Sequence, residues 1–543
     1  MDQETKGNKN ESSGIPPVSL LFPGESRLPE ASALRAQTTA DLSLDGIFDM
    51  KSASLASFFT DDPETVAYRY ETAEDVMNVP EALEAIRRCV PILSDIVDLR
   101  RLGAEADTTD SYIYSITEVE LYVSLLEHLS DKFLPLKSRL TSRAMTSLAD
   151  RIERLTSSEG YREINERLRE LSQRVREIGS VTVGVNLDSR LVPESAGLIS
   201  VNSEKFRSGQ TLDRILRLDL KENEYTFIAP LASASKAFSS YEDESMRKAV
   251  LTALETVFKS SFRAWRRIVK AYVLENTDFL LALLPEIEFL TKAGSFLSAL
   301  KERGVPLCRP VVRHDARRFA ARGLVNPVTA LRTDAPMVPN DVDFDENGGI
   351  YIITGPNRGG KSVFTQAVGL AAAMASLGLP AAAQSLEMTP FDNIFCHFPA
   401  GEDDTVEKGR LGEECARLSS IISAVTKDSI VLLDESLSST GSYEASSIAS
   451  EVVAGLSVIG CRTVFSTHLH ALASEIDGIN RRTAPLGGVR VDSLIAGISG
   501  GERSFKIIRS APEGKSYASD ITAKYGLSLD EILKSAGEGE REE

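Results

Sequence analysis

The sequence lacks any pair of cysteines at the spacing of a metal-binding or redox motif. Its five cysteines are scattered along 543 residues, which is typical of small core side chains in a reducing compartment. It also lacks an apolar run of membrane length, because the longest, from Gly369, is interrupted by Pro380. The first residues are polar and charged, so no secretory signal peptide is expected. These absences predict a cytoplasmic protein without membrane contact.

A surplus of positive charge is lacking as well. The chain carries 79 acidic and 61 basic residues, a formal net charge of −18. Proteins that coat nucleic acids by general attraction to phosphates are basic, so the charge argues against this class. A DNA-handling ATPase with a local basic patch is still compatible with this charge. A length of 543 residues predicts two to four domains.

The composition changes along the chain. Residues 1–60 are rich in Ser, Pro and Gly, and we expect a flexible tail there. Residues 61–304 read as a helical core and lever region whose clearest apolar stripe fits a bundle helix and a coiled-coil lever equally well. A small β-containing insertion is expected at about 180–235. In 305–530, short β runs alternate with helices, which predicts a mostly parallel sheet before an acidic end at 531–543.

A glycine-rich turn between a β-branched run and a helical run carries the clearest chemistry. It matches the pattern G-x-x-x-x-G-K-S, in which backbone amides and a helix N-terminus hold phosphates. Lys361 is predicted to reach the terminal phosphates and the Ser362 hydroxyl to bind Mg²⁺, so ATP and Mg²⁺ are the expected cofactors. The predicted nucleotide-binding residues here are Gly355, Pro356, Asn357, Arg358, Gly359, Gly360, Lys361, Ser362 and Val363.

Two later strand-like runs end in residues that suit phosphate chemistry. The apolar run 429–436 ends in paired acids, of which Asp434 is predicted to hold the metal, directly or through water. Glu435 is predicted to orient or activate the attacking water. A third run ends at His468, which either senses the γ-phosphate or is a surface histidine in a loop. The catalytic candidates are therefore Glu435, His468 and Lys361.

The segment Ser-Gly-Gly-Glu at 499–502 matches the signature loop of transporter ATPases. That loop precedes the strand with the paired acids and caps a helix, whereas this segment follows His468 and lies between β-like runs. We interpret it as a turn, and this position disfavours a transporter ATPase subunit.

The segments GPNRGGKS, VLLDES and STHLH together resemble the ATPase domain of the MutS family of DNA mismatch repair proteins. The resemblance is specific over about 305–530 and rests on architecture alone over 61–304, where the family has core, lever and clamp regions. It implies an ABC-type P-loop ATPase domain that forms a homodimer, with each nucleotide site completed by the partner subunit. It also places Asn340 near the adenine.

Some positions depart from the family pattern. They are Met337 in place of an aromatic residue that stacks on the base, His397 in place of arginine, and Leu437 and Ser439 in place of glycines. Thr440 and Tyr443 keep familiar places in the segment that runs along the family's dimer interface. The Ser-Thr pair that reaches the partner's γ-phosphate is replaced by Gly409 and Arg410, and Arg410 is a hypothetical cationic substitute.

The largest departure concerns mismatch recognition. Full-length members use an N-terminal domain with a Phe-x-Glu motif, but the only such motif here is 344–346, just before the phosphate loop. A tail of 60 residues is too short for the recognition and connector domains, so mismatch sensing of the usual kind is not expected. No nuclease-like domain is expected after the ATPase domain.

Three groups of basic residues are candidates for DNA contact, although each also fits a solvated or structural role. They are Arg100 and Arg101; Arg263, Arg266, Arg267 and Lys270 beside Trp265; and Arg313, Arg317, Arg318 and Arg322. The expected function is a dimeric ATPase clamp that couples ATP binding and hydrolysis to engagement of structured or mismatched DNA, with repair or recombination proteins as further partners. The alternative is a nucleotide-dependent protein-interaction switch that does not bind DNA.

Overall fold

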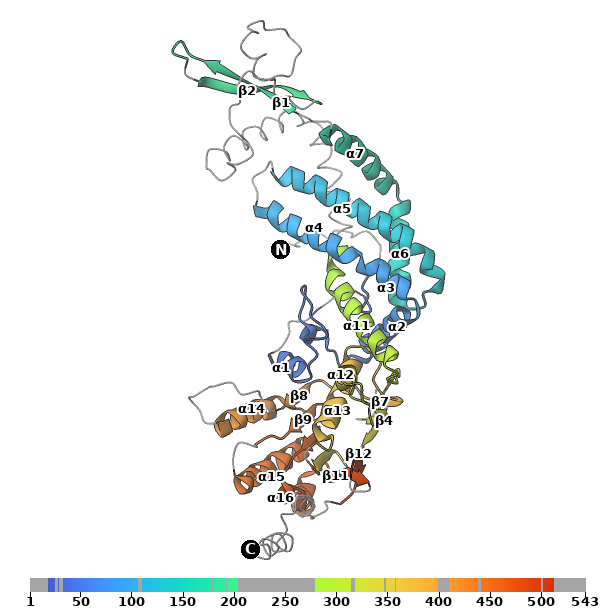
Figure 1. Ribbon diagram of the computed structural model, residues 1–543, viewed down its shortest axis with the longest axis vertical. Coiled ribbons are helices and arrows are strands. Elements are labelled where there is room, and N and C mark those ends of the chain that lie inside the picture. The colour runs from blue at the N-terminus through green and yellow to red at the C-terminus, as the bar shows by residue number, and fades with distance from the viewer. Residues whose placement is uncertain are drawn as a thin grey trace, which may run out of the picture. The chain divides into compact units, whose positions relative to one another are not determined.

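The computed structural model describes most of the chain as two compact units (Figure 1). The described residues are 18–24, 28, 33–105, 110–176, 180–191, 193–203, 279–313, 318–345, 348–356, 358–398, 410–437, 441–499 and 502–511. The first unit holds Val18 and the described residues within 81–140 and 145–287, and the second those within 19–80, 141–144 and 288–543. The helical core was predicted to span 61–304, whereas both of its ends belong to the second unit.

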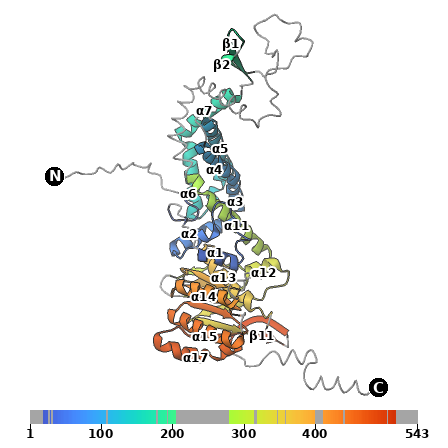
Figure 2. The same ribbon diagram turned by 90° about the vertical axis from the view of Figure 1, so that its left-hand side faces the viewer.

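The first unit consists of helices followed by a β-hairpin (Figure 2). Its elements are α3 (Pro80–Arg87), α4 (Cys89–Glu105), α5 (Asp110–Lys132), η2 (Leu134–Arg139), α6 (Arg143–Ser157), α7 (Glu159–Arg176), β1 (Ser180–Leu187) and β2 (Pro193–Asn202). On α6, Met145, Leu148 and Ile152 recur at spacings of three and four and are all buried, as an amphipathic helix requires. The antiparallel pair of β1 and β2 lies where the β-containing insertion is predicted.

The N-terminal segment is packed onto the second unit, so the prediction of a flexible tail through residue 60 is wrong for its described part. It forms α1 (Ala33–Asp41) and η1 (Leu55–Phe58), and α2 (Pro63–Asn78) follows it. Leu20 and Phe58 are completely buried, and the Phe58 ring stacks on Phe289 at 4.9 Å between centroids. The Thr38 hydroxyl donates to the backbone oxygen of Ile394, 2.5 Å away on an edge strand. The buried apolar residues Leu20 and Phe58 are too widely spaced to give a helical or strand pattern in the sequence.

A six-stranded sheet forms the centre of the second unit. Its order is β12-β11-β6-β10-β9-β8, and all neighbours run parallel except β11 and β12. The strands are β6 (Ile350–Thr354), β8 (Ile394–His397), β9 (Ile430–Asp434), β10 (Arg462–Ser466), β11 (Val491–Ser499) and β12 (Glu502–Arg509). Every residue of β6 and β9 is buried, as expected for parallel strands covered on both faces. The predicted mixed helical and α/β architecture is confirmed.

Helices cover this sheet, and a smaller sheet packs beside it. The further helices of this unit are α11 (Leu284–Glu302), α12 (Pro327–Arg332), α13 (Lys361–Ser376), α14 (Arg410–Ala424), α15 (Ser442–Ile459), α16 (His470–Ser474), α17 (Ile476–Thr483) and η4 (Ala484–Leu486). The smaller sheet has the order β3-β7-β4-β5, with β3 (Val311–Val312), β4 (Phe319–Leu324), β5 (Asn340–Phe344) and β7 (Ser385–Met388). Apolar residues of α14, α15 and α17 form one core cluster with β6, β9 and β10.

The two ends of the Ser-Gly-Gly-Glu segment lie in paired antiparallel strands, and its two glycines lie outside the described residues. Ser499 at the end of β11 pairs with Glu502 at the start of β12. The hairpin continues the parallel sheet at its edge, next to β6. This places β12 close to the phosphate loop that follows β6.

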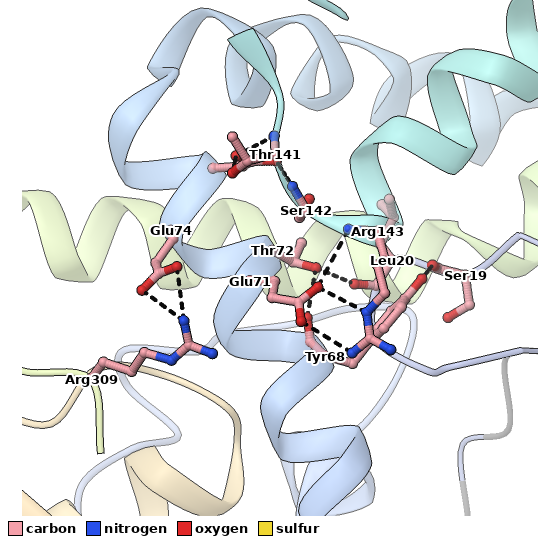
Figure 3. A network of polar contacts seen from close by, with 11 residues as sticks. Ser19, Leu20, Tyr68, Glu71, Thr72, Glu74, Thr141, Ser142, Arg143 and Arg309 are labelled. Carbon is pink, nitrogen blue, oxygen red and sulfur yellow. Dashed lines mark hydrogen bonds and ion pairs between the residues drawn. The ribbon is translucent and has the colours of Figure 1, made fainter. Parts of the chain in front are cut away.

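Acidic residues of α2 hold the segment that begins α6 (Figure 3). The Asp75 carboxylate accepts hydrogen bonds from the backbone amides of Thr141 and Ser142 at 2.8–3.1 Å and from the Thr141 hydroxyl at 2.9 Å. Glu71 pairs with Arg143 at 2.9 Å in the same network. The two residues that lead into α6 thus have their backbone amides satisfied by a carboxylate from α2.

None of the described helices is both long enough and apolar enough to cross a membrane. All five cysteines have free thiols, as expected from their spacing. A cytoplasmic location stays a prediction.

Candidate nucleotide site

The phosphate loop connects β6 to α13 through glycines that the backbone requires. Gly355 and Gly360 have φ values of 134° and 92°, in the region that disfavours residues with a side chain. A Cβ atom at Gly355 would lie 2.8 Å from the Cβ atom of Ala496 on β11. The loop therefore lies directly against the hairpin strand and ends at the N-terminus of α13.

Lys361 turns back over this loop. Its Nζ atom donates to the backbone oxygens of Gly355 and Pro356 at 2.9 and 3.2 Å. Burial lowers the pKa of Lys361, while the nearby carboxylates of Glu435 and Asp434 act in the opposite direction. The ammonium group lies within the turn that the sequence predicts to hold phosphates.

Two hydroxyl groups converge on the carboxylate of Asp434. The Ser362 hydroxyl donates to its Oδ1 atom at 3.0 Å, and the Ser466 hydroxyl donates to the same oxygen. Asp434 and Ser466 are direct neighbours in the pairing of β9 with β10, which brings their side chains together. Burial raises the pKa of Asp434, and the two hydroxyl groups act to lower it.

These oxygen donors fit Mg²⁺. This ion is usually held by one or two carboxylates together with substrate phosphates and water. Within the described part of the chain, no three His, Cys, Asp or Glu side chains gather into a self-sufficient metal site. Ser362 and Asp434 therefore suit a metal that arrives with a nucleotide.

Glu435 and His468 form a pair beside the metal-ligand candidates. The Nε2 atom of His468 lies 2.7 Å from the Oε1 atom of Glu435. Glu435 adopts a left-handed backbone with φ 47°, and its amide donates to the backbone oxygen of Ser466 at 2.9 Å. A non-glycine residue in this conformation at the end of a strand is a frequent feature of functional sites.

A cavity of about 400 Å³ opens beside the loop. Its lining includes several of the predicted residues, namely Arg358, Gly359, Gly360, Lys361, Ser362, Val363, Asn340 and Glu435. Met337 also lines it, as does Phe505, which the sequence analysis missed. Phe505 follows three residues after the Ser-Gly-Gly-Glu segment, and no local sequence pattern marks it as a cavity residue.

Asn340 lies at this cavity, but its amide group is already engaged. Its Nδ2 atom donates to the backbone oxygens of Val338 and Phe505 at 3.2 and 3.1 Å. Its Oδ1 atom accepts from the backbone amide of Ile507 at 2.7 Å. The residue predicted to lie near the adenine therefore links β5 to β12.

Other predicted positions lie outside the cavity lining. Pro356 accepts a hydrogen bond from the amide of Gly359 at 3.1 Å within the loop. Tyr443 on α15 is 87% exposed, and Arg410 is the first residue of α14. Asn357, Gly409, Ser439 and Thr440 lie outside the described residues. Phe344 of the Phe-x-Glu motif is buried against Tyr351, so it has a structural role.

His397 is buried at the end of β8. Its Nδ1 atom lies 2.7 Å from the Ser436 hydroxyl, directly after the paired acids, and its Nε2 atom has no hydrogen-bond partner within the described structure. Burial, together with the charge of Arg417, lowers the pKa of His397 to about 4. The ring is therefore neutral at physiological pH.

The described basic candidates for DNA contact lie in ion pairs. Arg313 pairs with Glu387 at 2.5 Å, and Arg318 and Arg322 both pair with Asp343, at 2.6 and 3.2 Å. In the first unit, Arg100 pairs with Glu118 at 2.7 Å and Arg101 lies 3.9 Å from Asp98. These ion pairs favour a structural role for the described basic residues over DNA contact. Arg317, Trp265 and the basic residues beside Trp265 lie outside the described residues.

Comparison with known proteins gives a consistent result. A family model described as MutS domain V matches residues 351–486, and one described as MutS2 N-terminal domain matches residues 61–303. The DNA mismatch repair protein MutS of Chlorobium phaeovibrioides is 27% identical over 507 residues, covering 88% of this chain and 55% of that protein. The human DNA mismatch repair protein Msh6 is 34% identical over 183 residues, covering 31% of this chain and 14% of that protein. The chain thus spans about half, or less, of the length of these relatives.

Proposed function

Because this chain belongs to the MutS family, we propose that its second unit carries an ABC-type P-loop ATPase domain that binds and hydrolyses ATP with Mg²⁺. The observation that carries the proposal is the meeting of three groups at the carboxyl ends of the neighbouring strands β6, β10 and β9. These are the loop with Lys361, the Ser362–Asp434 pair and the Glu435–His468 pair. This edge of a parallel sheet is the usual place for a nucleotide.

Each residue has a distinct task in this proposal. The loop amides and Lys361 hold the phosphates, for which Lys361 exchanges its present backbone acceptors. Ser362 and Asp434 hold the metal ion, which when bound neutralises charge on the phosphates. Glu435 accepts a hydrogen bond from the attacking water and receives its proton at a carboxylate oxygen. His468 holds the Glu435 carboxylate toward the cavity and sits where it could detect the γ-phosphate.

We propose further that the chain acts as a homodimer and couples ATP turnover to engagement of structured or mismatched DNA, at a cytoplasmic location. Support comes from the names of its relatives, which are DNA mismatch repair proteins, and from the two family models. A clamp of this kind needs two states that differ in their contacts to the γ-phosphate.

A second candidate function is a nucleotide-dependent protein-interaction switch that does not bind DNA. The net charge of −18 and the ion pairing of the described basic candidates favour it. It shares the proposed nucleotide chemistry and differs only in the partner.

The test is the ATPase rate of the wild type and of Glu435→Ala, each without DNA and with linear duplex, mismatched duplex and a four-way junction. An ATPase rate of the wild type that one DNA structure raises, together with no hydrolysis in Glu435→Ala, supports the clamp. Hydrolysis that no DNA alters, together with no salt-dependent retention of DNA by the ATP-loaded variant, supports the protein switch. A wild type that hydrolyses no ATP contradicts both.

A further inference from the structure

The side chain of Asn340 joins two sheets at the wall of the nucleotide cavity. It begins β5 of the smaller sheet, and its amide group bonds to two backbone positions of β12 in the larger sheet. Its Nδ2 atom donates to the oxygen of Phe505 at 3.1 Å, and its Oδ1 atom accepts from the amide of Ile507 at 2.7 Å. Lys506 adds a bond from its Nζ atom to the backbone oxygen of Pro339. The stretch 505–507 is therefore fixed on both sides of Lys506.

Phe505 is held in a conformation that the chain would not adopt by itself. Its φ is 54°, a left-handed value that is a genuine outlier for a bulky side chain. Its side chain is 46% exposed although it is large and apolar. Such a conformation costs free energy and persists only where surrounding contacts impose it. The bonds from Asn340 on either side of Lys506 are contacts of this kind.

The ring of Phe505 closes one side of the cavity. Its Cδ1 atom is 3.6 Å from the position that a Cβ atom of Gly360 would take, so the ring lies beside the N-terminus of α13. Away from the phosphate loop the lining is mostly apolar. Its apolar members are Leu324, Ala335, Pro336, Met337, Val338, Phe364 and Ala367, and Asn326, Thr329 and Asn340 are its polar members. A mostly apolar chamber whose lining includes two phenylalanines, Phe505 and Phe364, suits a planar base rather than phosphates.

We propose that Asn340 is a positioning residue for nucleotide binding: it does not contact the base but clamps β12 so that the Phe505 ring forms a face for the base. This inference rests on the proposed nucleotide site. Donation from Asn340 to a base would require breaking the bonds that its Nδ2 atom already makes to the backbone oxygens of Val338 and Phe505, and its Oδ1 atom already accepts from the Ile507 amide. Phe505 is the residue that would touch the ligand.

The test separates the base from the phosphates. Calorimetric titrations of the full chain, with Mg²⁺ present, measure two affinities. The affinity for ADP depends on the base and the phosphates, whereas the affinity for inorganic pyrophosphate depends on the phosphates alone. In Asn340→Ala and in Phe505→Ala, we expect ADP to bind on the order of tenfold more weakly, the usual effect of losing one base–aromatic stack. Pyrophosphate should bind as it does to the wild type, because the phosphate loop is unchanged. The double variant should lose no more ADP affinity than Phe505→Ala alone.

Asn480→Ala is a matched control. Asn480 makes the same two bonds to the other strand of this hairpin, with its Nδ2 atom donating to the oxygen of Val491 at 2.8 Å and its Oδ1 atom accepting from the Val491 amide at 2.9 Å. It does not line the cavity. This variant should bind ADP like the wild type, even if it unfolds more easily. If Asn340→Ala does not fold, Asn340→Asp replaces it in the test. This variant keeps an oxygen that accepts from the Ile507 amide but loses the nitrogen that donates to the Phe505 oxygen.

Each other outcome overturns the positioning role. ADP affinity unchanged in the Asn340 variants, or ADP and pyrophosphate weakened equally, would mean that Asn340 has only a structural role. A loss of ADP affinity in Asn340→Ala but not in Phe505→Ala would mean that Asn340 itself reads the base. A wild type that binds neither ligand would overturn the proposed function together with this inference.

Discussion

The imidazole of His468 and the carboxylate of Glu435 lie 2.7 Å apart, between the Nε2 and Oε1 atoms, and join the chain after β10 to the residue after β9. Both side chains are more than a third exposed, so water can reach them. Glu435 also lines the cavity beside the phosphate loop. A carboxylate held next to a water-accessible cavity in this way is suited to activate a water molecule.

Replacing Glu435 with Gln should separate hydrolysis from binding. The amide keeps the size of the side chain but cannot accept a proton, so we expect the ATP hydrolysis rate to fall about 10²–10⁴-fold. ATP affinity should stay within a few-fold of the wild type. Steady-state hydrolysis and equilibrium ATP binding measure the two effects. Glu451→Gln, at an exposed ion pair on α15, is the control and should keep both values. Equal hydrolysis in the two variants would exclude Glu435 as the base.

Ser466→Ala should weaken the response to Mg²⁺. The Ser466 hydroxyl donates to the Asp434 oxygen that also accepts from Ser362, so its removal frees the carboxylate to rotate. Loss of such an outer contact usually costs about tenfold or more in metal affinity. We expect the half-saturating Mg²⁺ concentration for ATP hydrolysis to rise by about this factor.

The control for this change is Ser493→Ala. Ser493 is also buried in a strand of the same sheet, but its hydroxyl has no hydrogen-bond partner within the described structure. The Mg²⁺ response should be unchanged in this variant. An unchanged response in Ser466→Ala as well would show that Ser466 does not orient the metal ligand.

The phosphate loop and the strands beside it could be predicted from the sequence because their signals are local. A fixed glycine spacing followed by Lys361 and Ser362 determines the turn, and fully apolar runs predict buried parallel strands. The contact between Ser362 and Asp434, 72 residues apart, follows once both strands belong to one sheet. Phe505 could not be found in this way. It reaches the cavity through an antiparallel hairpin and a left-handed backbone, for which a phenylalanine gives no local indication.

The N-terminal segment could not be predicted because its structure depends on distant residues. Asp41 forms an ion pair with Arg417, and Thr38 bonds to the backbone of Ile394, each more than 350 residues away along the chain. A composition rich in small and polar residues predicts disorder when such contacts are unknown. Leu20 and Phe58, both completely buried, lie 38 residues apart, so they share no period that a sequence pattern could reveal.

Asp75→Ala should destabilise the second unit. The buried Asp75 carboxylate accepts bonds from the amides of Thr141 and Ser142 and from the Thr141 hydroxyl. Removing it leaves backbone donors without a partner, which costs about 2–4 kcal/mol of the free energy of unfolding. Urea unfolding followed by circular dichroism measures this loss. The control is Glu74→Gln, at a partly exposed pair with Arg309, which should change stability by less than about 1 kcal/mol. A smaller effect in Asp75→Ala than in the control would contradict the anchoring role.

His397 should make the fold sensitive to acid. Burial lowers its pKa in the folded chain to about 4, below the ordinary value of 6.5. Protonation therefore favours the unfolded state, so the stability due to neutral His397 is complete above about pH 6.5 and is lost as the pH falls toward 4. The difference between these two pKa values corresponds to roughly 3 kcal/mol of the free energy of unfolding.

His397→Asn keeps a polar atom near the Ser436 hydroxyl but cannot be protonated, so its free energy of unfolding should fall less between pH 6.5 and 4. His470→Asn, at an exposed residue at the start of α16, should keep the wild-type slope in urea titrations across this range. Equal slopes in all three proteins would show that His397 is not the acid-sensitive group.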